Sequence, residues 1–400
     1  MAERAGETPA ASEGPAAERV QASVNVAAIE RNCARLRAGL ADGTQLCAVV
    51  KADGYGHGAV ASSRAALAGG ADWLAVAGSR ELCELRAAGL EVPILVMGAL
   101  TQGELADTLA ARGDVVVWAE RQVAAVAAAG GGRVHVKLDS GMGRLGTRHP
   151  EEASAVADAA DRTPGVELAG AMTHFATADE LDDDGFFSVQ LRVFERWVAA
   201  LKQTRPGLLV HAANSAAMLR DTAAQFDMVR CGIAIYGMDP FGEDPAERGL
   251  EPALELRSYL ADVKDCSAGE SAGYGRRFVA ERDTVVGVLP LGYGDGWRRN
   301  LTNACDVLIG GVRYPLVGTI SMDSVTVDLG PDGGESLLGE PAVLIGLQGS
   351  GRITAEEIAR RLETINYEIT CGLTPRVTRV YHRDGAPEAA RAAANEPGSA

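Results

Sequence analysis

The sequence has no apolar run long enough to cross a membrane, and its N-terminus lacks the apolar core of a secretion signal. It is also short of positive charge: 38 lysines and arginines stand against 54 aspartates and glutamates, a formal net charge of -16. That imbalance argues against a nucleic-acid or membrane-surface partner, because anionic phosphates would be repelled, although local arginines can still hold a small anion. We therefore expect a cytoplasmic protein that binds neither nucleic acid nor membrane.

The sequence contains no Cys-x-x-Cys pair, and its seven cysteines are scattered along the chain. A scattered, odd-numbered set fits a reducing compartment and argues against both a zinc site and a disulfide framework. We therefore expect no metal centre.

The chain does contain much glycine, 48 residues, and a regular alternation in its first part. Eight short apolar runs are mostly followed by segments with helical spacing, such as 79–88 and 187–203, which predicts a (β/α)8 barrel. A doubly wound open sheet remains the alternative, because periodicity cannot show closure. The runs are Cys47–Lys51, Trp73–Ala77, Ile94–Met97, Val115–Trp118, Val134–Leu138, Glu167–Met172, Leu208–Ala212 and Met228–Arg230.

Composition also predicts the domain boundaries. Residues 1–18 and 384–400 are rich in Ala, Glu, Gly and Pro without periodicity, so we expect disordered tails. Residues 19–248 form the expected barrel domain, with a first strand at about 20–25 that could pack with the second domain. Residues 249–383 alternate between apolar and polar around glycine-rich turns, which predicts a mainly antiparallel β-domain ending in a helix from about 355 to 368.

The most informative stretch is Ala48–Gly58, with the sequence AVVKADGYGHG, in which Lys51 ends an apolar run and opens a glycine-rich turn. A short apolar run before a turn is typical of a buried strand. A lysine at that point is either a surface residue or an amine in a dry site, where burial lowers its pKa and lets it form a Schiff base with an aldehyde. The glycines favour the dry site, because they allow a ligand to approach the backbone closely.

Polar residues follow several other expected strands too, and barrel active sites are built where strands end. Singly, such residues are more often structural, a lone histidine belonging to the core and a lone arginine to an ion pair. Several at the same end of successive strands are harder to explain in that way. Ser215 is expected to cap the next helix, whose N-terminus would suit a phosphate. The set is Lys51, Tyr55, Lys137, Asp139, Arg144, His174, His211, Asn214, Ser215 and Arg230.

Eight motifs, taken in order, resemble those of the alanine racemases, which are pyridoxal-phosphate enzymes of fold type III. The resemblance covers about Val20 to Tyr381. A single motif would be weak evidence for the family, but the whole set at family-like spacing is specific for it. It implies a barrel followed by a β-domain, pyridoxal 5'-phosphate as cofactor, and interconversion of L-alanine and D-alanine to supply D-alanine for peptidoglycan. The motifs are Val50–His57, Leu138–Arg144, Thr173–Ala176, His211–Ser215, Val229–Ile233, Gly273–Gly275, Ser321–Asp323 and Ile365–Tyr367.

The resemblance assigns the proton transfers to two residues. Lys51 would bind the aldehyde of the cofactor and act as the base on one face of the substrate Cα, and Tyr274 would act on the opposite face. In the family this tyrosine comes from the partner subunit, so a homodimer with shared active sites is implied. Arg230 would hydrogen-bond the pyridine nitrogen and disfavour its protonation, which limits transamination. His174 would lie between Arg230 and the Tyr274 hydroxyl.

The remaining implied roles concern binding. Arg144 would face the phenolic oxygen of the cofactor and orient the substrate carboxylate, and Lys137 is a candidate for carbamylation and pairing with Arg144. Tyr367, Tyr293 and Met322 would narrow the entrance to the size of alanine. The cofactor-binding set is Lys51, Tyr55, Arg144, His174, Asn214, Ser215, Arg230, Gly232, Ile233 and Tyr367, and the substrate-binding set is Arg144, Met322, Tyr293 and Asp323.

Two departures from the family pattern lie beside the expected carboxylate site: Ser321 replaces a common cysteine and Thr319 a common arginine. The main alternative is therefore a broad-specificity or serine racemase on the same scaffold, although Tyr367 and Met322 favour a small pocket. A fold-type-III decarboxylase has no need to combine the Gly-Tyr-Gly motif with Arg230. A non-catalytic pyridoxal-phosphate carrier is typically a single barrel, whereas this chain is predicted to have a second domain.

Overall fold

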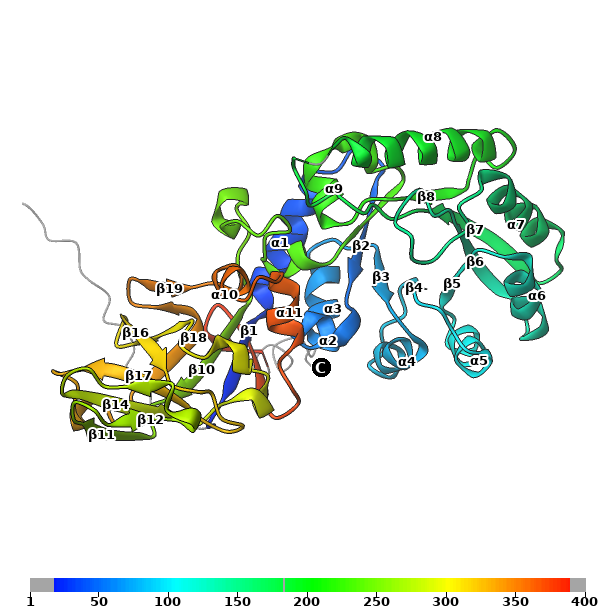
Figure 1. Ribbon diagram of the computed structural model, residues 1–400. Coiled ribbons are helices and arrows are strands. Elements are labelled where there is room, and N and C mark those ends of the chain that lie inside the picture. The colour runs from blue at the N-terminus through cyan, green and yellow to red at the C-terminus, as the bar shows by residue number, and fades with distance from the viewer. Residues whose placement is uncertain (1–17, 183, 389–400) are drawn as a thin grey trace, which may run out of the picture. The chain divides into compact units, whose positions relative to one another are not determined.

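A computed structural model describes residues 18–182 and 184–388, and contacts divide the chain into two units (Figure 1). The barrel unit comprises residues 24–254, 363–372 and 379 onward, and the sheet unit comprises the residues up to Ser23 together with 255–362 and 373–378. The predicted tails fall outside the described residues except at residues 18 and 384–388.

The barrel unit is built on a closed barrel of parallel strands, and this confirms the predicted (β/α)8 fold over the open sheet. Closure is direct, because β2 (Gln45–Val49) pairs in parallel with both β3 (Trp73–Val76) and β9 (Met228–Cys231). The strands between are β4 (Ile94–Val96), β5 (Asp114–Val117), β6 (Gly132–Lys137), β7 (Val166–Met172) and β8 (Leu209–His211).

Helices follow most of these strands and cover the outside of the barrel (Figure 1). The longest, α8 (Phe186–Thr204), buries one stripe that includes Phe187, Phe194 and Leu201, as the helical period requires. No helix within the described ranges is long and apolar enough to cross a membrane. The others are α1 (Val26–Ala38), α2 (Lys51–Tyr55), α3 (Ala59–Ala68), α4 (Ser79–Ala87), α5 (Gln102–Ala110), α6 (Glu120–Ala128), α7 (Pro150–Arg162), α9 (Ser215–Arg220) and α11 (Asn366–Cys371).

The sheet unit contains an antiparallel sheet, in which neighbouring strands from β11 to β10 run in opposite directions. Its strand order is β11 (Asp262–Cys266), β14 (Thr284–Leu289), β17 (Val325–Gly330), β16 (Val312–Val317), β15 (Asp306–Ile309), β18 (Pro341–Gln348), β10 (Leu254–Tyr259) and β1 (Gln21–Asn25). The short strand β19 (Gly351–Ile353) pairs with β18, and β12 (Ser271–Ala272) with β13 (Phe278–Val279). Residues of β10 and β17 are alternately buried and half-buried, which is the pattern of a sheet with one covered face.

Two expectations at the C-terminal end were wrong. The helix expected over 355–368 is two helices, α10 (Ala355–Arg361) and α11, because Glu363 adopts a left-handed conformation with φ of 53°. Residues 363–372 belong to the barrel unit and not to the β-domain expected over 249–383, since the Asn366 amide of α11 donates a buried hydrogen bond of 2.8 Å to the Asp239 carbonyl.

The tail predicted to be disordered from residue 384 is ordered at its start. Strand β20 (Thr378–Arg383) pairs with β21 (Ala386–Pro387), and the Asp384 carboxylate forms an ion pair of 2.9 Å with Arg31. Composition suggested disorder here, whereas the hairpin and the ion pair hold this segment in place.

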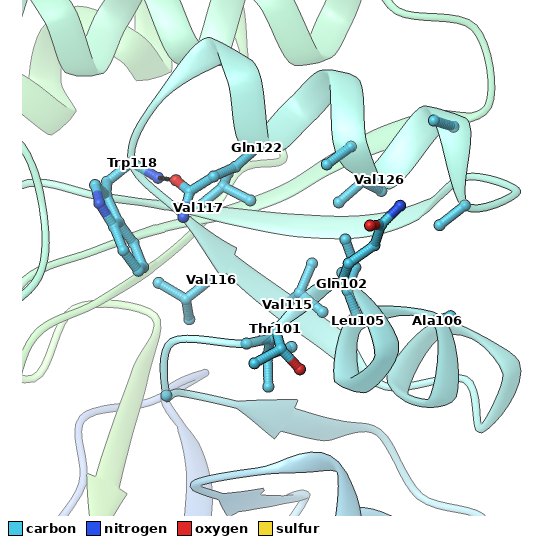
Figure 2. A pocket seen from close by; sticks show the side chains of 15 residues that line it. Thr101, Gln102, Leu105, Ala106, Val115, Val116, Val117, Trp118, Gln122 and Val126 are labelled. Atoms are coloured by element: carbon cyan, nitrogen blue, oxygen red, sulfur yellow. Dashed lines mark hydrogen bonds between the residues drawn. The ribbon is translucent and has the colours of Figure 1, made fainter.

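An apolar cavity of about 450 Å³ lies between β5 and helices α5 and α6 (Figure 2). Leu105, Val115 and Val126 are among the residues that line it, and the Trp118 backbone N–H donates to Gln122 Oε1 at one end. None of the predicted site residues contributes to its lining, so it is separate from the candidate active site.

Candidate active site

A second cavity, of about 360 Å³, is lined by residues at the C-terminal ends of the barrel strands. All ten residues predicted to bind the cofactor line it, so the structure brings together side chains that are up to 316 positions apart, from Lys51 to Tyr367. Residues with no predicted role also contribute, and several flank predicted ones in the same motifs. They are Val49, Ala52, Met97, Met142, Phe175, Ala176, Asp179 and Cys371.

Lys51 was expected to end a strand, but it begins α2, two residues after β2 ends at Val49. The next residues turn in the left-handed sense, with φ of 52° at both Ala52 and Asp53. That conformation costs non-glycine residues about 1–2 kcal/mol each, so neighbouring bonds must hold it. Glu81 does so by accepting hydrogen bonds from the backbone N–H groups of Ala52 and Ala77, at 2.6 and 2.7 Å.

The two lysines of the site have weakened basicity. Lys51 is half-buried, and its pKa lies below the ordinary value because of desolvation and the nearby Arg144. Lys137 is buried at the end of β6, where desolvation and the charges of Arg230 and Arg144 lower its pKa to about 8. Each amine is therefore more readily neutral, which is the nucleophilic form, than a lysine in water.

Arg230 is buried and its guanidinium is held firmly. It donates to the carbonyls of Ala212 and Thr173 at 2.8 and 2.9 Å, and to Nδ1 of both His211 and His174, at 2.8 and 3.3 Å. A guanidinium has no acceptor, so both Nδ1 atoms must be unprotonated. The pKa of His174 lies well below its ordinary value through desolvation and the charge of Arg230, so His174 is neutral and carries its proton on Nε2.

The lining of the cavity also contains hydroxyl groups and backbone N–H groups. Ser215 begins α9, and its Oγ accepts from the backbone N–H groups of Gly232 and Ala234, at 3.0 and 3.4 Å. The predicted cap was wrong by one residue: Asn214 caps α9, accepting from Ala217 through its side-chain oxygen, because Ser215 Oγ is engaged elsewhere.

The backbone at Gly232 approaches a tyrosine closely. A Cβ on this residue would lie 2.3 Å from the Tyr55 hydroxyl, so only glycine leaves room for that ring. Tyr55 is buried, and its ring centroid lies 5.9 Å from that of Tyr367 on α11. Tyr55, Ser215, Gly232 and Tyr367 all line the cavity, and we call this group the cradle.

These residues fit pyridoxal phosphate. The cradle supplies the hydroxyl and N–H donors that a phosphate ester requires, and Lys51 supplies an amine with lowered basicity for the aldehyde. Arg230 and Arg144 add fixed positive charge, and Asp179 is the one carboxylate among the described lining residues.

Three further predicted residues, Tyr274, Tyr293 and Met322, belong to the sheet unit, and we call them the Tyr274 surface. Their side chains are 71%, 41% and 51% exposed. Their loops are joined, since the Thr319 hydroxyl donates to the Tyr274 carbonyl at 2.6 Å and the Tyr293 N–H to the Ser321 carbonyl at 3.1 Å.

Asp323, which was also predicted to bind substrate, forms an ion pair of 2.6 Å with Arg376. Sequence reasoning assigned Arg376 no role. Neither Asp323 nor any residue of the Tyr274 surface lines the cavity of the barrel unit.

Comparisons with known proteins agree with this geometry. The family model "Alanine racemase, N-terminal domain" matches residues 24–240, and "Alanine racemase, C-terminal domain" matches residues 253–381. Alanine racemase 1 of Bacillus subtilis is 41% identical over 372 residues, covering 91% of this chain and 93% of that protein. The alanine racemase of Geobacillus stearothermophilus is 41% identical over 373 residues, covering 90% and 93%.

Solved structures of alanine racemases also resemble this chain over most of its length. The crystal structure of alanine racemase from E. faecalis superposes with a TM-score of 0.85 at 36% identity, covering 91% of this chain and 98% of that chain. The alanine racemase from Streptomyces coelicolor gives 0.84 at 38% identity with the same coverage. Fold, cavity and comparisons together show that the chain belongs to the alanine racemase family, the pyridoxal-phosphate-dependent racemases of alanine.

Proposed function

We propose that Lys51 and Tyr274 are the two bases with which this chain inverts alanine, with Tyr274 supplied by a second copy of the chain. Inversion requires that a proton leave one face of Cα and arrive at the other, so one group is needed on each side. The observation that carries the proposal is the Lys51 amine, half-buried and weakened in basicity, beside every predicted cofactor ligand.

Bound pyridoxal phosphate supplies an electron sink for the pair of electrons left at Cα when the proton departs. Lys51 takes or returns a proton at Nζ, because its lowered pKa makes the neutral amine accessible. Arg230, a fixed cation, faces the ring nitrogen and makes protonation there unfavourable. His174, with its proton on Nε2, can donate to the hydroxyl oxygen of Tyr274 from the second copy and so favour the phenolate.

The remaining residues bind and orient. Tyr55, Ser215, Tyr367 and the N–H groups of Gly232 and Ile233 hold the phosphate, with Asn214 fixing the start of α9 beside them. Arg144 orients the substrate carboxylate, and Met322, Tyr293 and Asp323 of the second copy enclose it. Lys137 is a candidate for carbamylation, since a carbamate would offset the positive charge of Arg144.

Support for a homodimer comes from the Tyr274 surface. Aromatic rings and methionine are enriched in interfaces, and three such side chains are clustered and exposed on the sheet unit when the chain is considered by itself. A second copy that inserts this surface into the barrel cavity would bury them and complete the site. An isolated chain would then lack one of its two bases.

The substrate size and the cellular role are also proposed. Tyr367 lines the cavity and limits the substrate side chain to the methyl group of alanine. D-Alanine from this reaction would supply peptidoglycan synthesis. The cytoplasm is the proposed location, supported by seven cysteines that are all unpaired in the structure.

Isotope exchange with a Tyr274→Phe variant tests the proposal. In deuterated water, loss of the phenol should slow removal of the α-proton from one enantiomer far more than from the other, because only one face loses its base. Tyr293→Phe is the matched control and should affect both enantiomers alike. Equal slowing of both enantiomers in Tyr274→Phe would contradict the assignment of one base to each face.

A further inference from the structure

A line of hydrogen bonds leads from Arg230 through the interior of the barrel to the opposite ends of its strands. Arg230 Nη1 lies 2.8 Å from His211 Nδ1, and His211 Nε2 lies 2.8 Å from His135 Nδ1. His135 Nε2 then lies 3.1 Å from Asp114 Oδ2, at the first residue of β5. The four side chains belong to residues no more than 3% exposed, so water does not interrupt the line.

The direction of every bond in this line is fixed by chemistry. The guanidinium of Arg230 can only donate, so His211 Nδ1 must accept and its proton must be on Nε2. That proton is donated to His135 Nδ1, which leaves the His135 proton on Nε2, pointing at the Asp114 carboxylate. A proton on both nitrogens of either ring would place two donors against each other. Both histidines are therefore neutral, each with its proton on Nε2.

The barrel is shaped around this line. A Cβ at Gly170 would lie 2.3 Å from His135 Nδ1, the atom that accepts from His211, so a side chain there would break the contact. The ring of Trp73 packs edge-on against His135, with centroids 5.9 Å apart. Burial by itself would raise the pKa of Asp114, but the hydrogen bond from His135 and the positive charge and hydrogen bond of Arg133 oppose this effect, and the pKa lies below its ordinary value.

We propose that Asp114 is a positioning residue for Arg230, acting through His135 and His211. By fixing both tautomers, the carboxylate presents an unprotonated Nδ1 to the guanidinium at the cofactor end of the barrel. Without it, both imidazoles can reverse their protons, and an N–H of His211 would then face the N–H groups of Arg230. A carboxylate that holds an imidazole in one tautomer is a known way to set up catalysis, but here two rings carry the effect.

This inference rests on the role proposed above for Arg230 at the ring nitrogen of the cofactor. If Arg230 loses its position, the nitrogen is more easily protonated and alanine is more often transaminated, leaving its amino group on the cofactor and releasing pyruvate. Pyruvate released per racemisation is therefore a readout that a purely structural role for Asp114 would not change.

The first test needs no variant. Nitrogen-15 NMR of the full chain with labelled histidine, with and without cofactor, reports the protonation of all six imidazoles. We expect His135 and His211 each to carry a proton on Nε2 and none on Nδ1, as the directions of the hydrogen bonds require. A proton on Nδ1 of either ring, or formation of an imidazolium, would overturn the proposal. Single His→Gln changes assign the signals.

The second test compares three variants. Asp114→Leu removes the acceptor and should shift the His135 tautomer and raise pyruvate per racemisation about ten-fold, the lower range for losing such a partner. Asp114→Asn keeps an acceptor oxygen but adds an amide donor, so we expect a smaller shift of the His135 tautomer and a smaller rise in pyruvate than in Asp114→Leu. Glu167→Gln, at the exposed end of the Arg133 ion pairs, is the control and should change neither readout.

Arg230→Gln separates the two proposals. If pyruvate does not rise in this variant, the role proposed for Arg230 is wrong. If pyruvate rises there but Asp114→Leu leaves both the tautomers and pyruvate unchanged, the role of Arg230 stands and the line to Asp114 has no function. Should Asp114→Leu fail to fold, the same two readouts in Asp114→Asn decide, and unchanged tautomers and pyruvate there would overturn the proposal.

Discussion

At the scale of single residues, the chemistry of the site comes from burial next to like charges. Lys51, Arg144 and Arg230 line one cavity, and the charges of Arg230 and Arg144 also act on the buried Lys137. All four side chains are cationic in water. Removing these groups from solvent makes their charged forms costly, and the lysines can respond by losing a proton, whereas the arginines stay charged. The sequence indicated the residue types, but only the fold shows how closely the charges gather.

Lys51→Ala should abolish the visible absorbance of the bound cofactor, because no other described amine lines the cavity to bind the aldehyde. Racemisation should fall to background at the same time. Lys264→Ala, which changes an exposed lysine of β11 paired with Asp262, is the control and should keep both. A visible band that persists in Lys51→Ala would show that another group anchors the cofactor.

Lys137 gives a prediction about pH. A carbamate forms when the neutral amine attacks carbon dioxide, making an N–C bond and releasing a proton. The pKa of about 8 means that the neutral amine is abundant above pH 8 and becomes scarce as the pH falls below 7. Carbon-13 NMR with labelled bicarbonate should therefore show a carbamate signal that weakens on acidification. The signal should be missing in Lys137→Ala, and its presence there would place the carbamate elsewhere.

At the scale of elements, apolar runs predicted the strands closely, but backbone reversals were not visible. β3 (Trp73–Val76) and β4 (Ile94–Val96) begin at the first residues of the predicted runs Trp73–Ala77 and Ile94–Met97, because a short apolar run is a local signal. The left-handed turn after Lys51 was not foreseen, since Ala52 and Asp53 do not favour positive φ. The break at Glu363 was missed for the same reason.

The tight contact at Gly232 should make the cradle sensitive to a single methyl group. Gly232→Ala would displace the Tyr55 ring, and we expect weaker cofactor binding by about ten-fold or more, measured by titrating the cofactor-free protein. Gly103→Ala in α5, where a Cβ meets nothing within 4 Å, is the matched control. It should leave cofactor affinity unchanged and raise the free energy of unfolding by about 0.5–1 kcal/mol. Equal cofactor affinities in the two variants would contradict the assignment of Gly232 to the cradle.

At the scale of the whole molecule, the sequence predicted the members of the site better than the contacts between them. Residues that follow strands were brought together as the barrel requires, because closure places all strand ends on one rim. The line from Arg230 to Asp114 was not predicted, since its members lie on β5, β6, β8 and β9, and no local pattern relates them. Nor did composition reveal that α11 belongs to the barrel unit.

Mixing two inactive variants tests whether the site is shared. Lys51→Ala and Tyr274→Phe proteins should each be inactive as homodimers, but a mixed dimer would contain one site with both bases intact. Random reassociation should then restore about a quarter of the normal racemisation rate, because half of the dimers are mixed and each has one good site of two. A mixture no more active than its components would mean that each site is built from one chain.

The position of α11 has a consequence for how the enzyme is made. The cradle closes on Tyr367, and residues 363–372 are packed into the barrel unit although the chain contributes them only after most of the sheet unit. Synthesis must therefore pass Tyr367 before the nascent chain can complete the cradle and bind the cofactor. Cofactor binding is thus a late step in the synthesis of the protein. Chains that end before Tyr367 would lack part of the cradle and would leave the cofactor unbound.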